Sequence, residues 1–156
     1  MKPKNHADVY FPPPLIYVVF FFLSLWIQKR VPLDTSWQLS MQATIVGWGL
    51  IVFSLLFNLT ALRKFFITKN SLIPHKPARS LETGGIYSYS RNPMYFGLLL
   101  LYSGLAVLLG NWWTFILIPL LILVVQLWII KKEEIYLENA FGKEYHNYRK
   151  RVRRWI

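Results

Sequence analysis

The chain has 156 residues, of which 54% are hydrophobic, 17% aromatic and none cysteine, and its formal net charge is +11. This length predicts a single domain and excludes a multidomain enzyme, and the lack of cysteine excludes disulfides, thiolate metal sites and a cysteine nucleophile. The apolar residues come in long runs, and the mean hydropathy is +0.34 at a pI near 10.0. Together these values indicate a membrane protein with basic edges rather than a soluble nucleic-acid binder.

Four apolar stretches are candidate membrane-spanning helices, which need about 20 residues each. They cover about residues 12–28, 42–62, 94–110 and 112–130. Prolines at 12–14 begin the first stretch, and proline is tolerated at a helix start. Lys2 and Lys4 ahead of it also fit a cleaved signal peptide, but no small-residue cleavage site follows Trp26, so we expect an uncleaved anchor.

The third and fourth stretches are separated by little more than Gly110 and Asn111, which predicts a tight antiparallel helical hairpin. The expected fold class is therefore an all-α integral membrane protein with one domain, 1–156. It has four transmembrane helices, this hairpin between the third and the fourth, a loop over 63–93 and a C-terminal helical segment over 131–156.

Charge placement predicts the orientation, because lysine and arginine are retained on the cytoplasmic side. All but two of the 18 lysines and arginines fall on the side that carries both termini and residues 63–93 and 131–156. Only Lys29 and Arg30 fall on the other side. We therefore expect cytoplasmic termini, a location in the cytoplasmic membrane if the source is bacterial or archaeal, and no nucleic-acid partner.

The segment after the fourth stretch carries an apolar stripe at steps of three or four residues, flanked by arginine and lysine. A helix with this pattern is typical of one that lies on an anionic membrane surface, and such a helix can also line a site. Gly142 is expected to divide the segment into two helices. The stripe consists of Leu137, Phe141, Tyr145, Tyr148, Val152 and Trp155.

The start of the third stretch is a candidate binding site. Asn92 is a good N-cap residue and Pro93 a good first helical residue, and Arg91 beside them favours an anionic ligand group. A plain cap next to a topological charge explains the same residues. The nearby tyrosines, Tyr87, Tyr89 and Tyr95, are candidates either for stacking on a planar ligand or for anchoring at the membrane interface.

Glu133 and Glu134 allow two interpretations as well. They form either a substrate-side carboxylate pair that includes a general base, or the boundary of the fourth span with Lys131 and Lys132. His75 and His146 are isolated from other metal-ligand side chains, so we expect no metal site. The chain has no GxGxxG, P-loop or GxSxG motif, which leaves the usual dinucleotide, nucleotide and hydrolase functions without support.

Two blocks of sequence resemble the integral-membrane methyltransferases that include isoprenylcysteine carboxyl methyltransferase and the phospholipid N-methyltransferases. The first block is Leu81-x-x-x-Gly85-Ile86-Tyr87-x-x-x-Arg91-Asn92-Pro93-x-Tyr95-x-Gly97. The second is Glu133-Glu134-x-x-Leu137-x-x-x-Phe141-Gly142-x-x-Tyr145-x-x-Tyr148-x-x-x-Val152. With the hairpin between them, the resemblance covers about residues 72–154.

The resemblance implies S-adenosyl-L-methionine as the cofactor, bound on the cytoplasmic side, and a small or lipophilic methyl acceptor. Glu133 and Glu134 are the catalytic candidates that it implies, Glu133 as the group that orients or deprotonates the acceptor. The implied cofactor-binding residues are Arg79, Ser80, Leu81, Glu82, Tyr87, Arg91, Asn92, Pro93, Met94 and Tyr95.

Two positions depart from the family pattern. Asn92 replaces a histidine, which keeps a hydrogen-bonding side chain but removes a titratable ring. Ile129 replaces the substrate-side arginine of the prenylcysteine enzymes, which argues against a prenylcysteine carboxylate as acceptor.

The sequence therefore predicts an S-adenosylmethionine-dependent methyltransferase whose acceptor, a carboxylate, an amine or a thiol, arrives from the bilayer. The alternative is a non-catalytic membrane protein that binds anionic lipid or a partner through its basic face. Membrane sterol reductases are similar over the second block, but their chains are much longer.

Overall fold

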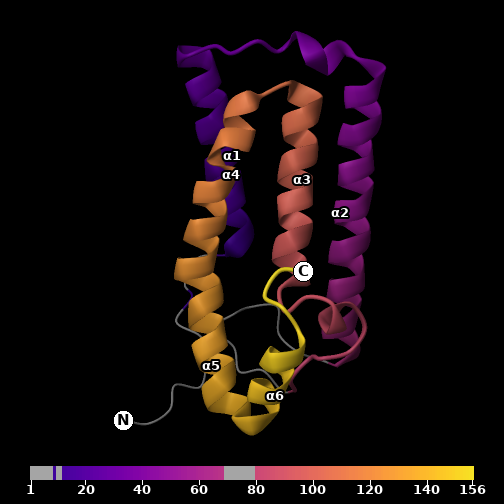
Figure 1. Ribbon diagram of the computed structural model, residues 1–156, viewed down its shortest axis with the longest axis vertical. Coiled ribbons are helices and arrows are strands. Elements are labelled where there is room, and N and C mark those ends of the chain that lie inside the picture. Colours follow the sequence, from indigo (N-terminus) through magenta and orange to yellow (C-terminus); the bar gives the residue numbers. More distant parts are fainter. Residues whose placement is uncertain (1–8, 10–11, 69–79) are drawn as a thin grey trace.

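The regular elements of the protein are helices throughout the part of the chain that the structure describes, which is residues 9, 12–68 and 80–156. The structure is a computed structural model, and Figure 1 shows a bundle of long helices with a short helix folded back at one end. The predicted all-α fold is thus confirmed for these residues. The elements are α1 (Pro13–Arg30), η1 (Ser36–Leu39), α2 (Met41–Ile67), η2 (Gly85–Ser88), α3 (Pro93–Leu109), α4 (Trp112–Val125), η3 (Gln126–Ile130), α5 (Lys131–Phe141) and α6 (Lys143–Arg151).

Among the described residues, two helices are long and apolar enough to cross a membrane. One is α2, and the other is the continuous helix Trp112–Phe141, in which α4, the π-helical turn η3 and α5 follow one another without a break. Helix α3 is apolar but shorter. Helix α2 continues to Ile67, beyond the stretch 42–62 expected from hydropathy. Its additional residues include Arg63 and Lys64, and cations are favoured near a helix C-terminus.

The helix ends follow from local sequence. The Ser40 hydroxyl accepts a hydrogen bond from the Ala43 N–H at 3.1 Å and caps α2, and the Asn111 side chain accepts one from the Trp113 N–H at 3.0 Å and caps α4. Gly110 ends α3 with φ 62°, a left-handed conformation that glycine adopts without strain. Gly110 and Asn111 therefore connect α3 and α4, which run in opposite directions in Figure 1.

Helices α2 and α3 pack closely because small residues lie between them. A Cβ atom added at Gly104 would come within 2.9 Å of both the Gly47 carbonyl oxygen and the Ile51 side chain. Small residues allow the backbones of membrane helices to approach one another in this way. This contact fixes α3, and with it the residues at its first turn.

Replacing Gly104 by alanine is expected to destabilise the protein by about 1–3 kcal/mol, because the added methyl group would push against the backbone of α2. Gly49 provides a matched control on α2, since a Cβ atom there would meet nothing within 4 Å. Gly49→Ala should leave stability unchanged or raise it by up to about 1 kcal/mol. Denaturant titration in one detergent checks both, and equal stability of the two variants would contradict the packing argument.

Helix α1 is held against the α3–α4 connection by buried polar side chains. The Ser24 and Thr114 hydroxyls lie 2.8 Å apart, and the Asn111 amide donates to Ser24 at 3.2 Å. All three side chains are buried, so these bonds satisfy polar groups that would otherwise be costly inside the bundle.

Helix α6 folds back on α5 at Gly142, where φ is 49°, so this glycine divides the segment into two helices as predicted. The apolar stripe does not form an open lipid-binding face. Tyr145, Tyr148 and Val152 are buried, and three partly buried residues pack on them: Leu81, Leu137 and Phe141. These residues of the stripe face inward, where they pack against Leu81 of the loop before α3.

Candidate active site

Tyr95 and Glu133 form a hydrogen-bonded pair where α3 begins and α5 begins. The Tyr95 hydroxyl donates to the Glu133 carboxylate at 2.7 Å. The Tyr17 hydroxyl of α1 in turn donates to the Tyr95 backbone carbonyl at 2.9 Å. Three elements that are distant in sequence therefore hold one carboxylate and one phenol in fixed positions.

The Glu133 carboxyl has a pKa above its ordinary value. It lies in α5, beyond the apolar stretch 112–130. Burial raises the pKa of Glu133 to about 7, the hydrogen bond from Tyr95 offsets part of this rise, and the neighbouring Glu134 adds to it. A carboxylate with this pKa exchanges a proton readily near neutral pH, as a general base must.

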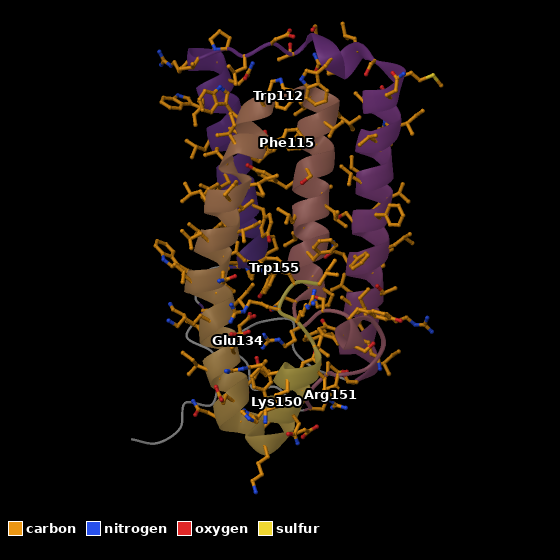
Figure 2. All side chains as sticks on the ribbon, in the orientation of Figure 1. Trp112, Phe115, Glu134, Lys150, Arg151 and Trp155 are labelled. Carbon is orange, nitrogen blue, oxygen red and sulfur yellow. The ribbon has the colours of Figure 1, made fainter. Side chains whose placement is uncertain are left out.

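Glu134 has a different environment, because two arginines occupy its oxygens. Arg154 makes a bidentate contact, Nε to Oε1 at 2.9 Å and an Nη atom to Oε2 at 2.6 Å. Arg91 lies 2.9 Å from Oε1 and donates a further hydrogen bond to the Tyr145 hydroxyl. Figure 2 shows Glu134 at the end of the bundle that carries α5 and α6. Its two oxygens therefore join α5, the start of α3 and the residues after α6.

The start of α3 differs from the expected open cap. Asn92 holds the N-cap position, as predicted, but its side chain makes no capping hydrogen bond. Its amide donates instead to the Arg154 carbonyl at 2.9 Å, and the Arg91 backbone N–H donates to the Arg153 carbonyl at 3.0 Å. The residues after α6 therefore lie against the beginning of α3.

The loop before α3 brings several expected cofactor residues to the same end. Ser80 donates to Glu82 at 3.1 Å, and Leu81 packs on the buried tyrosines of α6. Tyr87 is buried, its ring centroid lies 6.0 Å from that of Phe65, and its backbone carbonyl accepts a hydrogen bond from the Tyr148 hydroxyl at 2.6 Å.

Nearby carboxylates contribute to the pKa of Tyr87. Burial, followed by Tyr148, Glu82 and Glu133, raises the pKa of the Tyr87 hydroxyl above its usual range, so the phenol stays protonated and can donate a hydrogen bond. Two other expected residues, Pro93 and Met94, form the first turn of α3, with Pro93 buried. Arg79 lies outside the described residues, as does His75. Tyr89 is 75% exposed and does not contribute to this cluster.

Sequence reasoning missed four residues of this region. Tyr17 supports Tyr95, Arg154 binds Glu134, and the Trp155 indole donates to the Gln126 side chain at 3.4 Å. Two of them carried a signal: Gln126 is a polar residue inside an otherwise apolar span, and Trp155 lies on the apolar stripe. Tyr17 and Arg154 are recognisable only once distant segments are brought together.

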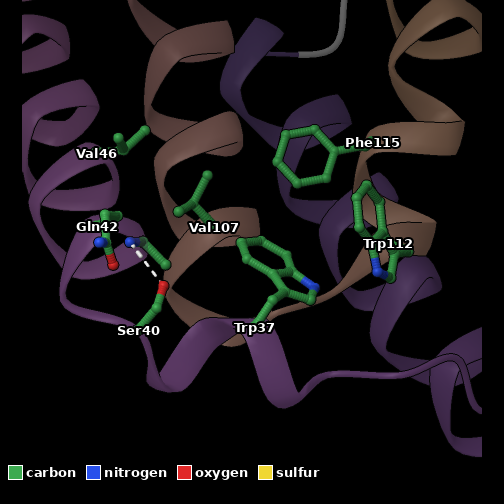
Figure 3. Close-up of a pocket in the computed structure, with 8 residues that line it drawn as sticks. Trp37, Ser40, Gln42, Val46, Val107, Trp112 and Phe115 are labelled. Carbon is green, nitrogen blue, oxygen red and sulfur yellow. Dashed lines mark hydrogen bonds between the residues drawn. The ribbon is translucent and has the colours of Figure 1, made fainter.

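A shallow apolar groove of about 390 Å³ lies at the opposite end of the bundle. Figure 3 shows Trp37, Trp112 and Phe115 on one side of it and Ser40 and Gln42 near its rim. None of the described residues that line it carries an ionisable side chain. The groove therefore offers no acid–base chemistry, in contrast to the Tyr95–Glu133 pair.

A family model described as "Phospholipid methyltransferase" matches residues 42–144, which is more than half of the chain. The chain belongs to this family. The matched range contains both Tyr95 and Glu133. Membership of the phospholipid methyltransferase family confirms the resemblance found in the sequence, and it supports a membrane methyltransferase as the general class of the protein.

Two other proteins are similar to parts of this chain. An uncharacterized protein of Haemophilus influenzae is 41% identical over 63 residues, which are 40% of this chain and all of the relative. The protein-S-isoprenylcysteine O-methyltransferase of Schizosaccharomyces pombe is 40% identical over 72 residues, which are 46% of this chain and 30% of that enzyme. The match thus spans less than a third of the yeast protein. No solved structure matches the chain.

Proposed function

We propose that the protein is an S-adenosyl-L-methionine-dependent methyltransferase that methylates a lipophilic amine supplied by the bilayer. The observation that supports this most directly is the Tyr95–Glu133 pair, with its carboxyl pKa of about 7. The family supports methyl transfer in general. The cofactor, the acceptor and the residue roles are inferred from the chemistry of the site.

We further propose a membrane arrangement with four spans formed by α1, α2, α3 and α4. At about 1.5 Å per residue, the 18 residues of α1 and the 17 of α3 approach the thickness of the hydrocarbon core. Figure 1 shows α5 and α6 at the same end of the bundle as the C-terminal end of α2. This end bears most of the basic residues, so the positive-inside rule supports a cytoplasmic site and cytoplasmic termini.

The residues around the start of α3 fit the proposed cofactor. The Arg91 Nε atom is buried and lacks a hydrogen-bond partner among the described residues, so it has a donor left for a carboxylate. Glu82 would accept from hydroxyl or amine groups, and Tyr87 would donate from its protonated phenol. We assign the rest of the cofactor contacts to Arg79, Ser80, Leu81 and the first turn of α3, residues 92–95.

When bound, the cofactor would supply an electrophilic methyl group on a sulfonium, whose bond from sulfur to the methyl carbon breaks in the transfer and leaves a neutral thioether. An ammonium acceptor must lose one proton before its nitrogen lone pair can form the new N–C bond, whereas a carboxylate acceptor needs no base. Glu133 would take that proton on its carboxylate, while Tyr95 holds the carboxylate in place. Ile129 is buried and offers no cation for a carboxylate acceptor, which also favours an amine.

Equilibrium binding of S-adenosylhomocysteine to the detergent-purified protein tests the cofactor site. We expect micromolar-range affinity that falls about tenfold or more in Glu82→Ala and Tyr95→Ala, because each loses a polar contact inside a partly buried site. Tyr89→Ala is the matched control, since this tyrosine of the same region is exposed. The acceptor is tested with radiolabelled donor and vesicles that contain phosphatidylethanolamine.

The absence of binding to a folded, monodisperse sample would reject the proposed function. The non-catalytic alternative would then be favoured, with anionic lipid bound by the exposed basic residues at the end of α6. These residues are Arg149, Lys150 and Arg151. Figure 2 shows Lys150 and Arg151 at the same end as Glu134.

A further inference from the structure

Residues 152–156 run from the end of α6 back toward the apolar part of the bundle. Val152 packs with Tyr145 and Tyr148, and the carbonyls of Arg153 and Arg154 accept hydrogen bonds from the start of α3. The Arg154 side chain is fixed by its bidentate contact with Glu134. Backbone and side chain together hold this segment in one place.

Trp155 is the residue of this segment that packs against the buried cluster of the bundle. Its ring packs against the buried cluster that contains Tyr95, Ile129 and Ile130, and its N–H donates to Gln126 at 3.4 Å. Figure 2 shows Trp155 farther along the bundle axis toward the apolar helices than Glu134. The indole thus lies nearer than Glu134 to the apolar part of the bundle, against the cluster that contains Tyr95.

We infer that Trp155 is a specificity-determining residue that forms the membrane-side wall of the acceptor site and limits the size of the acceptor's amine group. The inference rests on the proposed function. Trp155 packs against the buried cluster that includes Tyr95, and Tyr95 is the hydrogen-bond partner of Glu133. An amine that approaches Glu133 from the apolar part of the bundle would therefore meet the indole. Arg154 and Gln126 act as positioning residues, because Arg154 anchors the segment to Glu134 and Gln126 accepts a hydrogen bond from the indole N–H.

The wall has a chemical consequence for successive methylation. Each methyl group added to a lipid amine enlarges the group that must fit beside the indole, and one methyl group in a shaped pocket changes selectivity by about 10- to 200-fold. The aromatic face of tryptophan attracts an ammonium group whether or not it is methylated, so the size of the group and not its charge is the basis of the discrimination. The wild type should therefore distinguish acceptors by their number of N-methyl groups.

Three lipids with identical acyl chains test the inference: phosphatidylethanolamine and its N-monomethyl and N,N-dimethyl derivatives. We expect Trp155→Ala to raise kcat/KM for the dimethyl lipid relative to the unmethylated one by about tenfold or more. Gln126→Ala should also raise kcat/KM for the dimethyl lipid relative to the unmethylated one, but by a smaller factor. S-adenosylhomocysteine affinity should not change. Trp128→Ala is the control, because this indole lies on η3, as Gln126 does, but is 65% exposed.

The inference would be overturned if the ratio of kcat/KM for the dimethyl lipid to that for the unmethylated lipid were equal in the wild type and Trp155→Ala. The same increase of this ratio in Trp128→Ala would overturn it as well. If Trp155→Ala fails to fold, Trp155→Phe keeps a ring of smaller size and should give a shift of intermediate size. Failure of the proposed function would look different, because the wild type itself would bind no S-adenosylhomocysteine and methylate none of the three lipids.

A second measurement needs no catalysis. The chain contains no cysteine, so Trp155→Cys and Trp128→Cys each introduce a single thiol. Vesicles containing the dimethyl lipid should slow maleimide modification of the first variant but not of the second, relative to phosphatidylglycerol vesicles. Equal rates for the first variant in both kinds of vesicle would place the acceptor elsewhere and overturn the inference.

Discussion

Glu133→Gln is expected to reduce kcat for an amine acceptor by about 10²- to 10⁴-fold, because the variant keeps the shape and hydrogen bonding of the side chain but cannot accept a proton. S-adenosylhomocysteine affinity should be retained, since the carboxylate acts on the acceptor. Single-turnover methylation of phosphatidylethanolamine vesicles measures the loss. Glu138→Gln changes an exposed glutamate of the same helix and should have no such effect.

The pH profile gives an independent measure of the same role. Because the Glu133 pKa is raised to about 7, the base is protonated and inactive below this pH, and kcat/KM should rise with pH to a plateau above it. The hydrogen bond from Tyr95 lowers the Glu133 pKa, so Tyr95→Phe should move the rise to higher pH. Turnover of Glu133→Gln within about threefold of wild type, with an unchanged profile, would exclude a general base at this position.

Glu134→Gln is expected to cause the largest loss of stability among single polar substitutions at this site, about 3–5 kcal/mol. The Glu134 and Arg91 side chains are only 11% and 10% exposed, and the substitution would leave two guanidinium groups without their counter-charge. The segment after α6 should loosen at the same time, because Arg154 loses its bidentate partner. Denaturant titration measures the stability, and amide hydrogen exchange over residues 152–156 measures the loosening.

The chain contains a matched exposed pair for comparison. Glu138 and Arg149 lie 3.4 Å apart with side chains 47% and 46% exposed, so Glu138→Gln should cost at most about 1 kcal/mol. A Glu134→Gln variant as stable as Glu138→Gln would show that the two arginines find other partners. Glu134 would then have no structural role in holding residues 152–156.

Local sequence was sufficient to predict much of the fold. Prolines, caps and glycines indicated where α1, α3, α4 and α6 begin, because each of these signals acts within a few residues of its own position. Helix α2 ends five residues beyond the expected span 42–62, since hydropathy detects the apolar part of a helix and not its charged last turn. The sequence left two roles open for the apolar stripe, because periodicity identifies an apolar face but not its partner.

The site residues were predicted by resemblance more than by spacing. Glu133 and Glu134 are adjacent in sequence and alike in chemistry, yet one carries a raised pKa and the other holds two arginines. The difference arises from burial, which raises the pKa of Glu133, and from Arg91 and Arg154, which occupy the oxygens of Glu134. The sequence alone does not bring these groups together. Contacts of this kind depend on packing across 20 to 62 residues of chain, for which no local pattern exists.

The π-helical turn η3 has a consequence for how such a protein can change over time. A π-helical turn is equivalent to one residue inserted into an α-helix, and one residue rotates everything after it by about 100°. The turn therefore sets the direction in which α5 points Glu133 relative to the side chains of α4. Insertion or loss of a single residue there would turn the Glu133 carboxylate about the helix axis and leave the side chains of α4 where they are.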